Sequence, residues 1–382
     1  MDEKPVSFRK GMSFLRSNPF SPLSHIQINE THYVHFPVMK RGKGAYLYDY
    51  DENRFVDFDL QESALIHGHA SPRLTSVIKA YLGRAYLKGF SFSAHRSLSK
   101  TVNDVLYTES DLEPILFYID SVCDARDILP TILCGTSVKG RGVYISSRDI
   151  NLNPIYSSRY YHNLIPSSFT DVQNLNWKDI AYAVVCIDGK VQHDVALRTL
   201  KLLRNNDIIC IADAALVCSF IQLKRLADWY NRFDALLFGD WLASGLSFCA
   251  VAVHDASLLQ AQIDDAVRTV QATSAVFKLK TAQKSLLLLE KSGGLEQLLD
   301  KHRHFFTELD KKYFQLTGGL VCLRDEKQLT NTYADLRTQL FRAGFIFPLS
   351  CKTPISLSFA HSDELLNRCA LGINEALHLF YR

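Results

Sequence analysis

Three short apolar segments near the middle of the chain constrain its fold more than any other feature. Residues 208–213 are apolar up to a final carboxylate, and residues 234–240 also end in a carboxylate. Residues 248–253 follow after a short turn and carry no charge. Apolar runs of this length are typical of parallel strands that are covered on both faces. We therefore expect one buried sheet with two carboxylates at neighbouring strand ends, where such sheets bind ligands.

Further strands and helices extend this pattern. Apolar runs over 115–121, 142–146 and 183–188 alternate with helix-like segments, and such alternation predicts a parallel-dominated, doubly wound α/β sheet. Helical periodicity continues over 256–300, and shorter elements follow, with a last strand over 355–359. We expect an N-terminal arm and hairpin (1–58), a large domain (59–290) and a small C-terminal α+β domain (291–382).

Composition excludes several classes of function. Of the 382 residues, 47% are hydrophobic and 22% are charged, as in ordinary globular proteins. The net charge of +3 gives no reason to expect nucleic acid or an anionic membrane as a partner. No apolar run approaches the roughly 18 residues that span a bilayer, and the charged N-terminus lacks the apolar core of a signal peptide. We expect a cytoplasmic protein.

The histidines offer weak candidates for chemistry. His67 and His69 have the spacing of a metal-binding pair, but no third ligand lies nearby in the sequence, so we expect no metal. His361 precedes Ser362 and Asp363, either of which is a good N-cap for the final helix. We therefore interpret the segment around His361 as a helix cap and not as a catalytic site.

Five segments together resemble a known family. They are the hairpin-like residues 44–58, the turn 65–72, the strand that ends in Asp213, the step Gly239-Asp240 and the turn 359–364. The family is that of the class III, fold-type I pyridoxal-phosphate-dependent aminotransferases, and the resemblance is greatest to glutamate-1-semialdehyde 2,1-aminomutase. It implies a fold-type I architecture and a homodimer in which the partner subunit contributes to each site.

The resemblance also assigns roles to single residues. Asp213 matches the aspartate that pairs with the pyridinium nitrogen of the cofactor. Asp240 stands where the family carries the lysine of the Schiff base, and an aspartate cannot form an imine. Ser91 matches a serine of the loop that lines the site from the dimer partner.

The segments that hold the cofactor in the family are altered here. The family carries Ser-Gly-Thr at the start of a helix whose free amides bind the phosphate. This chain carries Ser121-Val122-Cys123, so that a bulky side chain replaces the glycine. The tyrosine that stacks on the cofactor ring has no counterpart in residues 148–151, and the partner's threonine matches about Ala272.

These changes lead to a prediction of function with two alternatives. We predict a degenerate glutamate-1-semialdehyde aminomutase-like protein that binds pyridoxal phosphate weakly or not at all. It would act as a binding or regulatory pseudoenzyme, for a small molecule in the vestigial cleft or for a protein. One alternative is an active enzyme that uses non-covalent pyridoxal or pyridoxamine phosphate, or acid–base chemistry with Asp213 and Asp240. Another is a subunit that completes the site of an active paralogue across a two-fold interface.

The two carboxylates also carry an electrostatic expectation. In an emptied cleft, Asp213 and Asp240 would share a semi-buried cavity. Two carboxylates that close disfavour joint ionisation, and burial adds to the effect, so one pKa is expected to rise. Arg126 would cancel this effect if its side chain reached the cavity.

Overall fold

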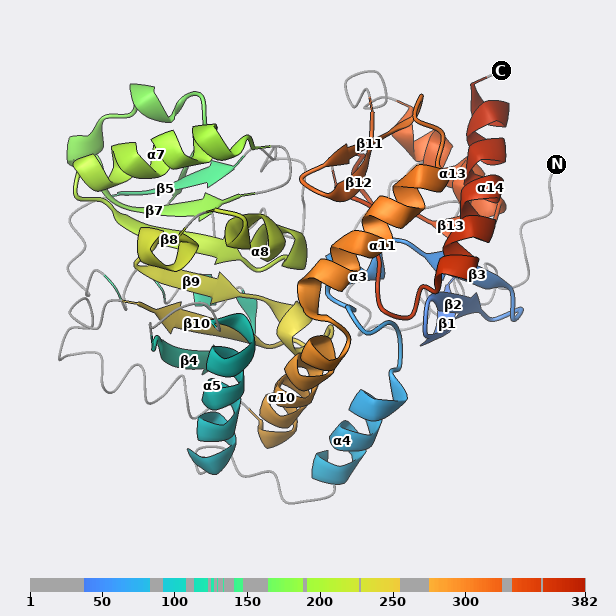
Figure 1. Ribbon diagram of the computed structural model, residues 1–382, viewed down its shortest axis with the longest axis horizontal. Helices are drawn as coiled ribbons and strands as arrows, with labels where there is room; N and C mark the ends of the chain where they lie inside the picture. Colours follow the sequence, from blue (N-terminus) through green and yellow to red (C-terminus); the bar gives the residue numbers. More distant parts are fainter. Residues whose placement is uncertain are drawn as a thin grey trace, which may run out of the picture. The chain divides into compact units, whose positions relative to one another are not determined.

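The computed structural model of the chain describes residues 38–82, 92–107, 113–122, 125–126, 129, 133, 141–146, 164–187, 191–226, 228–254, 275–324, 332–351 and 353–381. The chain divides into two compact units, Pro72–Gln297 and the combination of Met1–Ser71 with Leu298–Arg382 (Figure 1). The described part of the predicted arm and hairpin (1–58) begins at residue 38 and falls in the same unit as the C-terminal segment.

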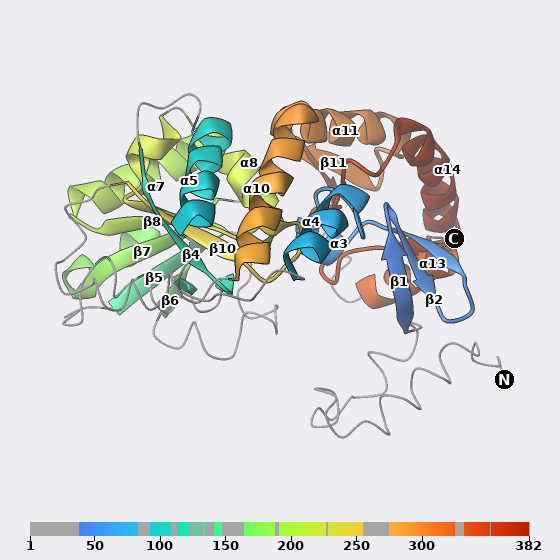
Figure 2. The same cartoon turned by 90° about the horizontal axis from the view of Figure 1, so that it is seen from below.

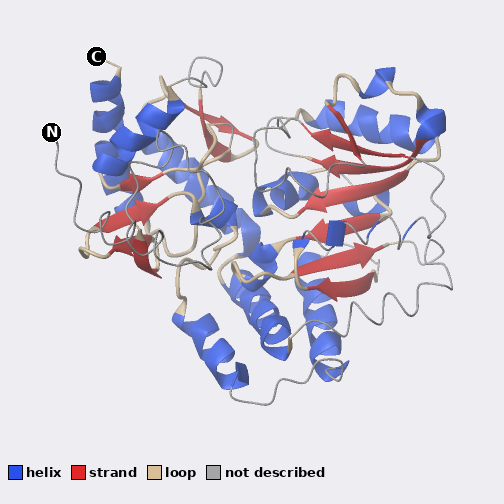
Figure 3. Cartoon of the chain, turned by 180° about the vertical axis from the view of Figure 1, so that it is seen from behind, coloured by secondary structure: helices blue, strands red, loops and turns tan. Residues whose placement is uncertain are grey.

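The first unit is built on one seven-stranded sheet, drawn in red in Figure 3. Its strands β5 to β9 pair in parallel, and β10 pairs antiparallel with both β9 and β4. This confirms the predicted parallel-dominated α/β sheet. In spatial order the strands are β4 (Ile115–Ile119), β10 (Cys249–Val253), β9 (Ala235–Phe238), β8 (Ile209–Ala214), β7 (Ile180–Cys186), β5 (Arg141–Ser146) and β6 (Leu164–Ser167).

The direction of β10 corrects the expectation of a parallel strand there. Parallel neighbours need a crossover of a dozen or more residues, and the link from Phe238 to Cys249 is shorter than that. All five residues of β10 are nevertheless buried, since it lies inside the sheet between β9 and β4. The apolar pattern thus identified burial correctly, whereas the length of the link decides direction.

Helices cover this sheet. The helices α7 and α8 pack on β8, and α10 packs along α5 and α4, as Figures 1 and 2 show. Pro72 is the first residue of α4, in agreement with its preference for helix starts. The helices are α4 (Pro72–Leu82), α5 (Phe92–Leu106), α7 (His193–Asn205), α8 (Val217–Lys224) and α10 (Val276–Lys291).

The second unit contains the predicted hairpin. Strands β2 (Tyr46–Asp49) and β3 (Arg54–Asp57) pair antiparallel, and β3 also pairs in parallel with β13 (Phe345–Ile346). Asp49 holds the turn, because its carboxylate accepts hydrogen bonds from the backbone amides of Asp51 and Asn53, both at 2.9 Å. The hairpin prediction is confirmed.

The remaining elements of this unit surround an apolar core that includes Phe58, Phe305 and Leu366. The last predicted strand is wrong: residues 355–358 form no strand, and Phe359 lies in a turn. The amides of Ile355 and Ser356 donate single hydrogen bonds to the carbonyls of Val321 and Phe58. The elements are β1 (Met39–Lys43), the single turn α3 (Leu60–Ser63), α11 (Gly294–Glu308), β11 (Phe314–Thr317), β12 (Leu320–Leu323), α13 (Tyr333–Arg342) and α14 (Asp363–Phe380).

The structure confirms the helix-cap interpretation of the segment around His361. The hydroxyl of Ser362 accepts a hydrogen bond from the amide of Leu365 at 3.2 Å, as an N-cap does. His361 itself is fully buried beside Ser358. His69, one of the pair considered for a metal, contacts Asp57 through its Nε2 atom at 2.7 Å. Among the described residues, no group of three or more metal-ligating side chains gathers.

Two buried imidazoles make this unit sensitive to acid. Burial lowers the pKa of His302 to about 3 and that of His361 to about 4. In the unfolded chain both would titrate near 6.5, so the unfolded state takes up protons first as the pH falls. We expect either imidazole to remove about 2 kcal/mol of stability between pH 7 and pH 5. Urea unfolding of His302→Gln should show a smaller loss over this range than the wild type, and an equal loss in both would contradict the prediction.

Asp59 has the opposite effect on the pH dependence of stability: its ionisation lowers the stability of the fold as the pH rises. Burial, and then the charges of Asp57 and Glu62, raise its pKa to about 7. Because the folded state holds this proton more tightly, stability falls as the pH rises from about 4, where the unfolded carboxyl titrates, to about 7. The shift corresponds to an upper limit of about 4 kcal/mol, which we discount to about 2 kcal/mol for solvent screening. Asp59→Asn should therefore gain more stability over the wild type at pH 8 than at pH 5, and a constant difference at both would contradict this.

No helix in the described part of the chain is long and apolar enough to cross a membrane.

Candidate functional site

Asp213 lies near the end of strand β8, as the sequence predicts, and its side chain is buried in the first unit. One of its carboxylate oxygens accepts a hydrogen bond from Nη2 of Arg126 at 2.7 Å. The same oxygen is 3.4 Å from the hydroxyl of Tyr144, and the other accepts the amide of Ala215 at 3.0 Å. The Arg126 and Asp213 side chains are only 9% and 2% exposed. A buried ion pair therefore occupies the end of this strand.

Arg126 reaches Asp213 from the segment after β4. The amide of Ala125 donates to the carbonyl of Ser121 at 3.1 Å, which closes one helical turn just before Arg126. The side chain of Val122 packs against the apolar core of the sheet. Ser121 and Val122, two of the residues predicted to face a phosphate, thus lie at the start of this turn. Cys123 and Ser91, the other two, lie outside the described residues.

Asp240 follows strand β9 and opens a short 3-10 helix, η6 (Asp240–Ala243). Its carboxylate accepts a hydrogen bond from the amide of Phe248 at 3.2 Å. Burial raises its pKa, although this amide and the positive charges of Lys278 and Arg126 act in the opposite direction. The pKa of Asp240 thus rises because of burial, and not because of the repulsion between two carboxylates that we expected. Arg126 does reach the site, where it pairs with Asp213 and acts to lower the pKa of Asp240.

The backbone around Asp240 is fixed on both sides. A Cβ atom on Gly239 would lie 2.0 Å from the carbonyl oxygen of Ala215, so only glycine allows β9 to pass this close to the end of β8. On the other side, the buried indole of Trp241 donates to the carbonyl of Ala214 at 3.1 Å and stacks on Phe220. The backbone thus determines the position from which residue 240 presents its side chain.

Lys278, in the first turn of α10, is a member of this site that the sequence analysis missed. Its ammonium nitrogen lies 3.2 Å from the carboxylate of Asp120, and its side chain is 17% exposed. Asp120 directly follows β4. In the sequence, Lys278 is one of several lysines in a helical segment. No local pattern marks it, because its partners come from other elements.

Together, three carboxylates and two cations form what we call the Asp213 cluster. The carboxylates are those of Asp120, Asp213 and Asp240, and the cations are Arg126 and Lys278. Both cations already have a carboxylate partner within 3.2 Å. With all five groups ionised, the cluster has no excess of positive charge with which to hold an anion.

At the level of sequence, comparison with known proteins yields only matches to a short segment of the chain. No model of a protein family matches the chain. A segment of 64 residues is 39% identical to glutamate-1-semialdehyde 2,1-aminomutase 2 of Bacillus thuringiensis (strain Al Hakam), and the same holds for that of Bacillus cereus (strain AH187). The match spans 17% of this chain and only 15% of those curated relatives.

Solved structures match almost the whole chain. An omega-transaminase from Sphaerobacter thermophilus superimposes with a TM-score of 0.73 at 13% identity over 98% of both chains. N-acetylornithine aminotransferase from Stenotrophomonas maltophilia K279a gives 0.70 at 14% identity, over 92% of this chain and 98% of the other. An ornithine aminotransferase from Toxoplasma gondii, with pyridoxal phosphate at partial occupancy, gives 0.67 at 15% identity over 99% and 98%. The chain therefore has the fold of the fold-type I pyridoxal-phosphate-dependent aminotransferases.

Proposed function

We propose that this chain is a class III aminotransferase-like pseudoenzyme that has lost the ability to form an internal aldimine and acts by binding. The observation that carries the proposal is the buried ion pair between Arg126 and Asp213 at 2.7 Å. In the family that the sequence resembles, the aspartate matching Asp213 faces a positively charged pyridinium ring. Here the chain supplies that positive charge itself.

The described residues do not fit pyridoxal phosphate. For the ring nitrogen to meet Asp213, the guanidinium of Arg126 would have to leave, and a buried charge that loses its partner costs about 3–5 kcal/mol. The phosphate would meet Val122, whose side chain packs on the core, and the carboxylate of Asp120. Free amides and an excess of positive charge are what such a group needs.

The position at which the resemblance expects the Schiff-base lysine also carries no amine. Asp240 stands on the scaffold where the resemblance expects the lysine, and a carboxylate forms no imine. Lys278 is the nearest amine in the Asp213 cluster, but Asp120 holds it as an ion pair. An ammonium in an ion pair must lose both its proton and its partner before it can attack a carbonyl carbon.

A second function is favoured by one observation. Burial raises the pKa of Asp240, and its side chain remains partly exposed, which suits a general acid or base. Asp213 would be a poor second catalyst because Arg126 holds it in an ion pair. We therefore place cofactor-independent acid–base chemistry at Asp240 second to a binding role.

We further propose that the protein is a cytoplasmic homodimer, as the resemblance implies. A cleft that is completed by the partner subunit would also let the chain pair with an active paralogue. Sedimentation of the full chain at micromolar concentration tests the dimer directly, and a single monomeric species would refute it.

The proposed loss of aldimine chemistry has a direct test. The purified chain is incubated with excess pyridoxal phosphate, reduced with borohydride, and digested for mass spectrometry. We expect no absorbance band of bound cofactor after dialysis and only scattered, substoichiometric adducts on exposed lysines. A stoichiometric adduct on one lysine, Lys278 in particular, would overturn the proposal. Lys278→Met distinguishes the two outcomes. It would abolish a specific adduct on Lys278, but it should leave the scattered adducts on exposed lysines unchanged.

A further inference from the structure

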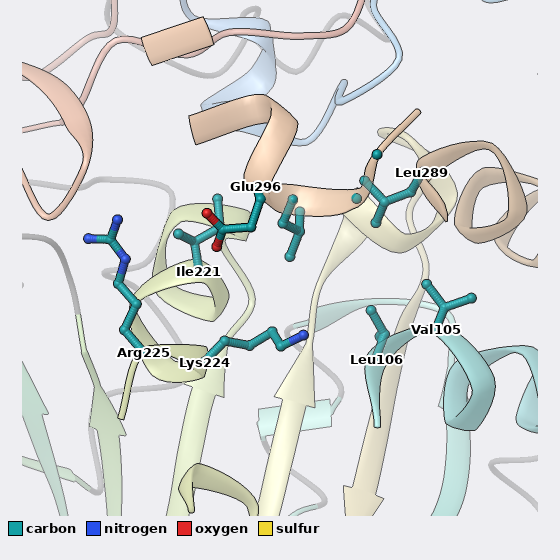
Figure 4. Close-up of a pocket in the computed structure, with 10 residues that line it drawn as sticks. Val105, Leu106, Ile221, Lys224, Arg225, Leu289 and Glu296 are labelled. Atoms are coloured by element: carbon teal, nitrogen blue, oxygen red, sulfur yellow. The ribbon is translucent and has the colours of Figure 1, made fainter. Parts of the chain in front are cut away.

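A cavity of about 250 Å³ in the first unit leaves little apolar surface for a ligand (Figure 4). The apolar side chains in its wall include Leu106, Ile221 and Leu289, and each of these is exposed by no more than 3%. Its charged lining residues carry both signs, as Lys224 and Glu296 show. We therefore assign this cavity no ligand. A less common feature, a left-handed turn, lies in the second unit.

Residues 60–63 form this left-handed turn without a glycine. The φ angles of Leu60, Gln61, Glu62 and Ser63 are 48°, 53°, 56° and 70°. The ψ angles of Gln61 and Glu62 are 55° and 43°, close to those of an ideal left-handed helix. In a residue that has a Cβ atom, this conformation brings Cβ too close to the following carbonyl oxygen, so such residues adopt it singly and seldom in a run. Four of them in succession store backbone strain.

Contacts at both ends hold the turn in this conformation. At its start, one carboxylate oxygen of Asp57 accepts the amides of Asp59 at 2.8 Å and Leu60 at 3.1 Å. The side chain of Leu60 is fully buried. At its end, the hydroxyls of Ser63 and Ser356 share a hydrogen bond of 2.7 Å. Backbone strain persists only where the surroundings fix it, and strained residues are common in segments that switch between two conformations.

The groups that act on the Asp59 carboxyl come from its own segment and from α13. Burial, and then the charges of Asp57 and Glu62, raise its pKa, whereas Arg337 of α13 and the amide of Glu62 act in the opposite direction. The hydroxyl of Tyr333, also on α13, lies close enough to be affected by the charge of Asp59. While Asp59 keeps its proton, the turn carries only the charges of Asp57 and Glu62.

Ionisation of Asp59 works against the left-handed turn. It adds a negative charge between those of Asp57 and Glu62, and Asp57 is held in place by His69, whose Nε2 atom lies 2.7 Å from its carboxylate. A turn that unwinds lets Asp59 and Glu62 move apart and into water, where their repulsion is screened. Unwinding also relieves the backbone strain. Repulsion and strain therefore act in the same direction.

We propose that residues 60–63 are a pH-sensitive conformational switch. The turn is left-handed while Asp59 carries its proton, and it relaxes to ordinary backbone torsions when Asp59 ionises. The switch uses groups of the second unit alone and needs no cofactor. Its failure would leave the proposed loss of aldimine chemistry untouched, and the reverse also holds.

Hydrogen exchange of the full chain, followed by mass spectrometry, tests the switch. The reporters are the amides of Ser63 and Leu65, which donate to the carbonyls of Asp59 and Leu60. The relaxed form ionises near pH 4 and the turn near pH 7, so the relaxed form gains as the pH rises between these values. After correction for the intrinsic pH dependence of exchange, we expect protection to fall about tenfold or more from pH 5 to pH 7. Asp59→Asn should remove this fall.

Two variants at one position test the strain itself. The side chain of Gln61 is exposed, so its exchange costs no packing. Gln61→Gly removes the Cβ atom that makes the left-handed conformation unfavourable, and it should raise the protection of the turn by about threefold to tenfold. Gln61→Ala is the matched control, because it keeps Cβ, and it should change the protection less than about twofold.

Three results would each overturn the proposal. The first is equal protection of the turn at pH 5 and pH 7 in the wild type, a measurement that needs no variant. The second is a fall in protection that persists in Asp59→Asn. The third is equal protection in Gln61→Gly and Gln61→Ala, because the turn would then store no strain.

Discussion

The variant Asp240→Lys should fail to bind pyridoxal phosphate stoichiometrically and should show no transamination. The new amine would project from a fixed backbone, but Arg126 would still occupy the carboxylate of Asp213. A clamp that has lost two charge-assisted hydrogen bonds forfeits about 3–6 kcal/mol, and a missing ring stack about 1 kcal/mol more. Together these losses, about 4–7 kcal/mol, lower the cofactor affinity by about three to five decades.

A matched double variant tests whether Arg126 is what prevents the cofactor from binding. Arg126→Leu in the Asp240→Lys background frees the Asp213 carboxylate for a ring nitrogen, so the double variant should bind cofactor more tightly than Asp240→Lys alone. Adding Val122→Gly and Cys123→Thr should improve it again. Equilibrium dialysis followed by absorbance measures the affinity, and borohydride reduction locates the adduct. Stoichiometric binding and turnover by Asp240→Lys alone would mean that a single residue separates this site from activity, and our proposal would then be wrong.

The variant Arg126→Met should lower the free energy of unfolding by about 3–5 kcal/mol, because it leaves the carboxylate of Asp213 buried without its cation. Asp213→Asn should cost less, since the carboxylate of Asp240 still acts on the guanidinium of Arg126. Urea denaturation at pH 7 measures both.

The double variant Arg126→Met with Asp213→Asn provides the control. If the two groups interact as a pair, the double variant should be more stable than the sum of the single changes predicts, by about 1–3 kcal/mol. Additive effects would show that the pair contributes no coupling energy. The Arg198–Asp194 pair is fully on the surface, so Arg198→Met should change stability by less than about 1 kcal/mol.

The sequence was sufficient to predict the sheet, because burial on both faces leaves uniformly apolar runs such as β8 and β10. It also predicted that Asp213 and Asp240 end neighbouring strands, since parallel strands end at one edge. The direction of β10 required the length of its connection, which apolar patterning does not express. The segment 355–359 looks like a strand for the same reason: most of it is buried, yet its amides donate to three different segments, at Val321, Phe58 and Ile66, and form no ladder with any of them.

The ion pairs of the site were harder to predict. Arg126 and Asp213 are 87 residues apart, and only the position of Arg126 just after β4 signals that it lies near the same edge of the sheet. Lys278 gives no such signal. Which side chain of a helix reaches a given strand end depends on how the helix is rotated and packed, and these are properties of the whole unit.

Around residue 240, selection for a stable fold and selection for chemistry act on different atoms. Gly239 and Trp241 hold this point of the chain through contacts with Ala215 and Ala214, none of which involves the side chain of residue 240. Exchange of that side chain therefore removes its hydrogen bond with the amide of Phe248 but leaves these backbone contacts in place. A gene in such a lineage can change its product from catalyst to binder in one substitution while the protein continues to accumulate at its former level. Quality control in the cell, which responds to unfolding, would not detect the difference.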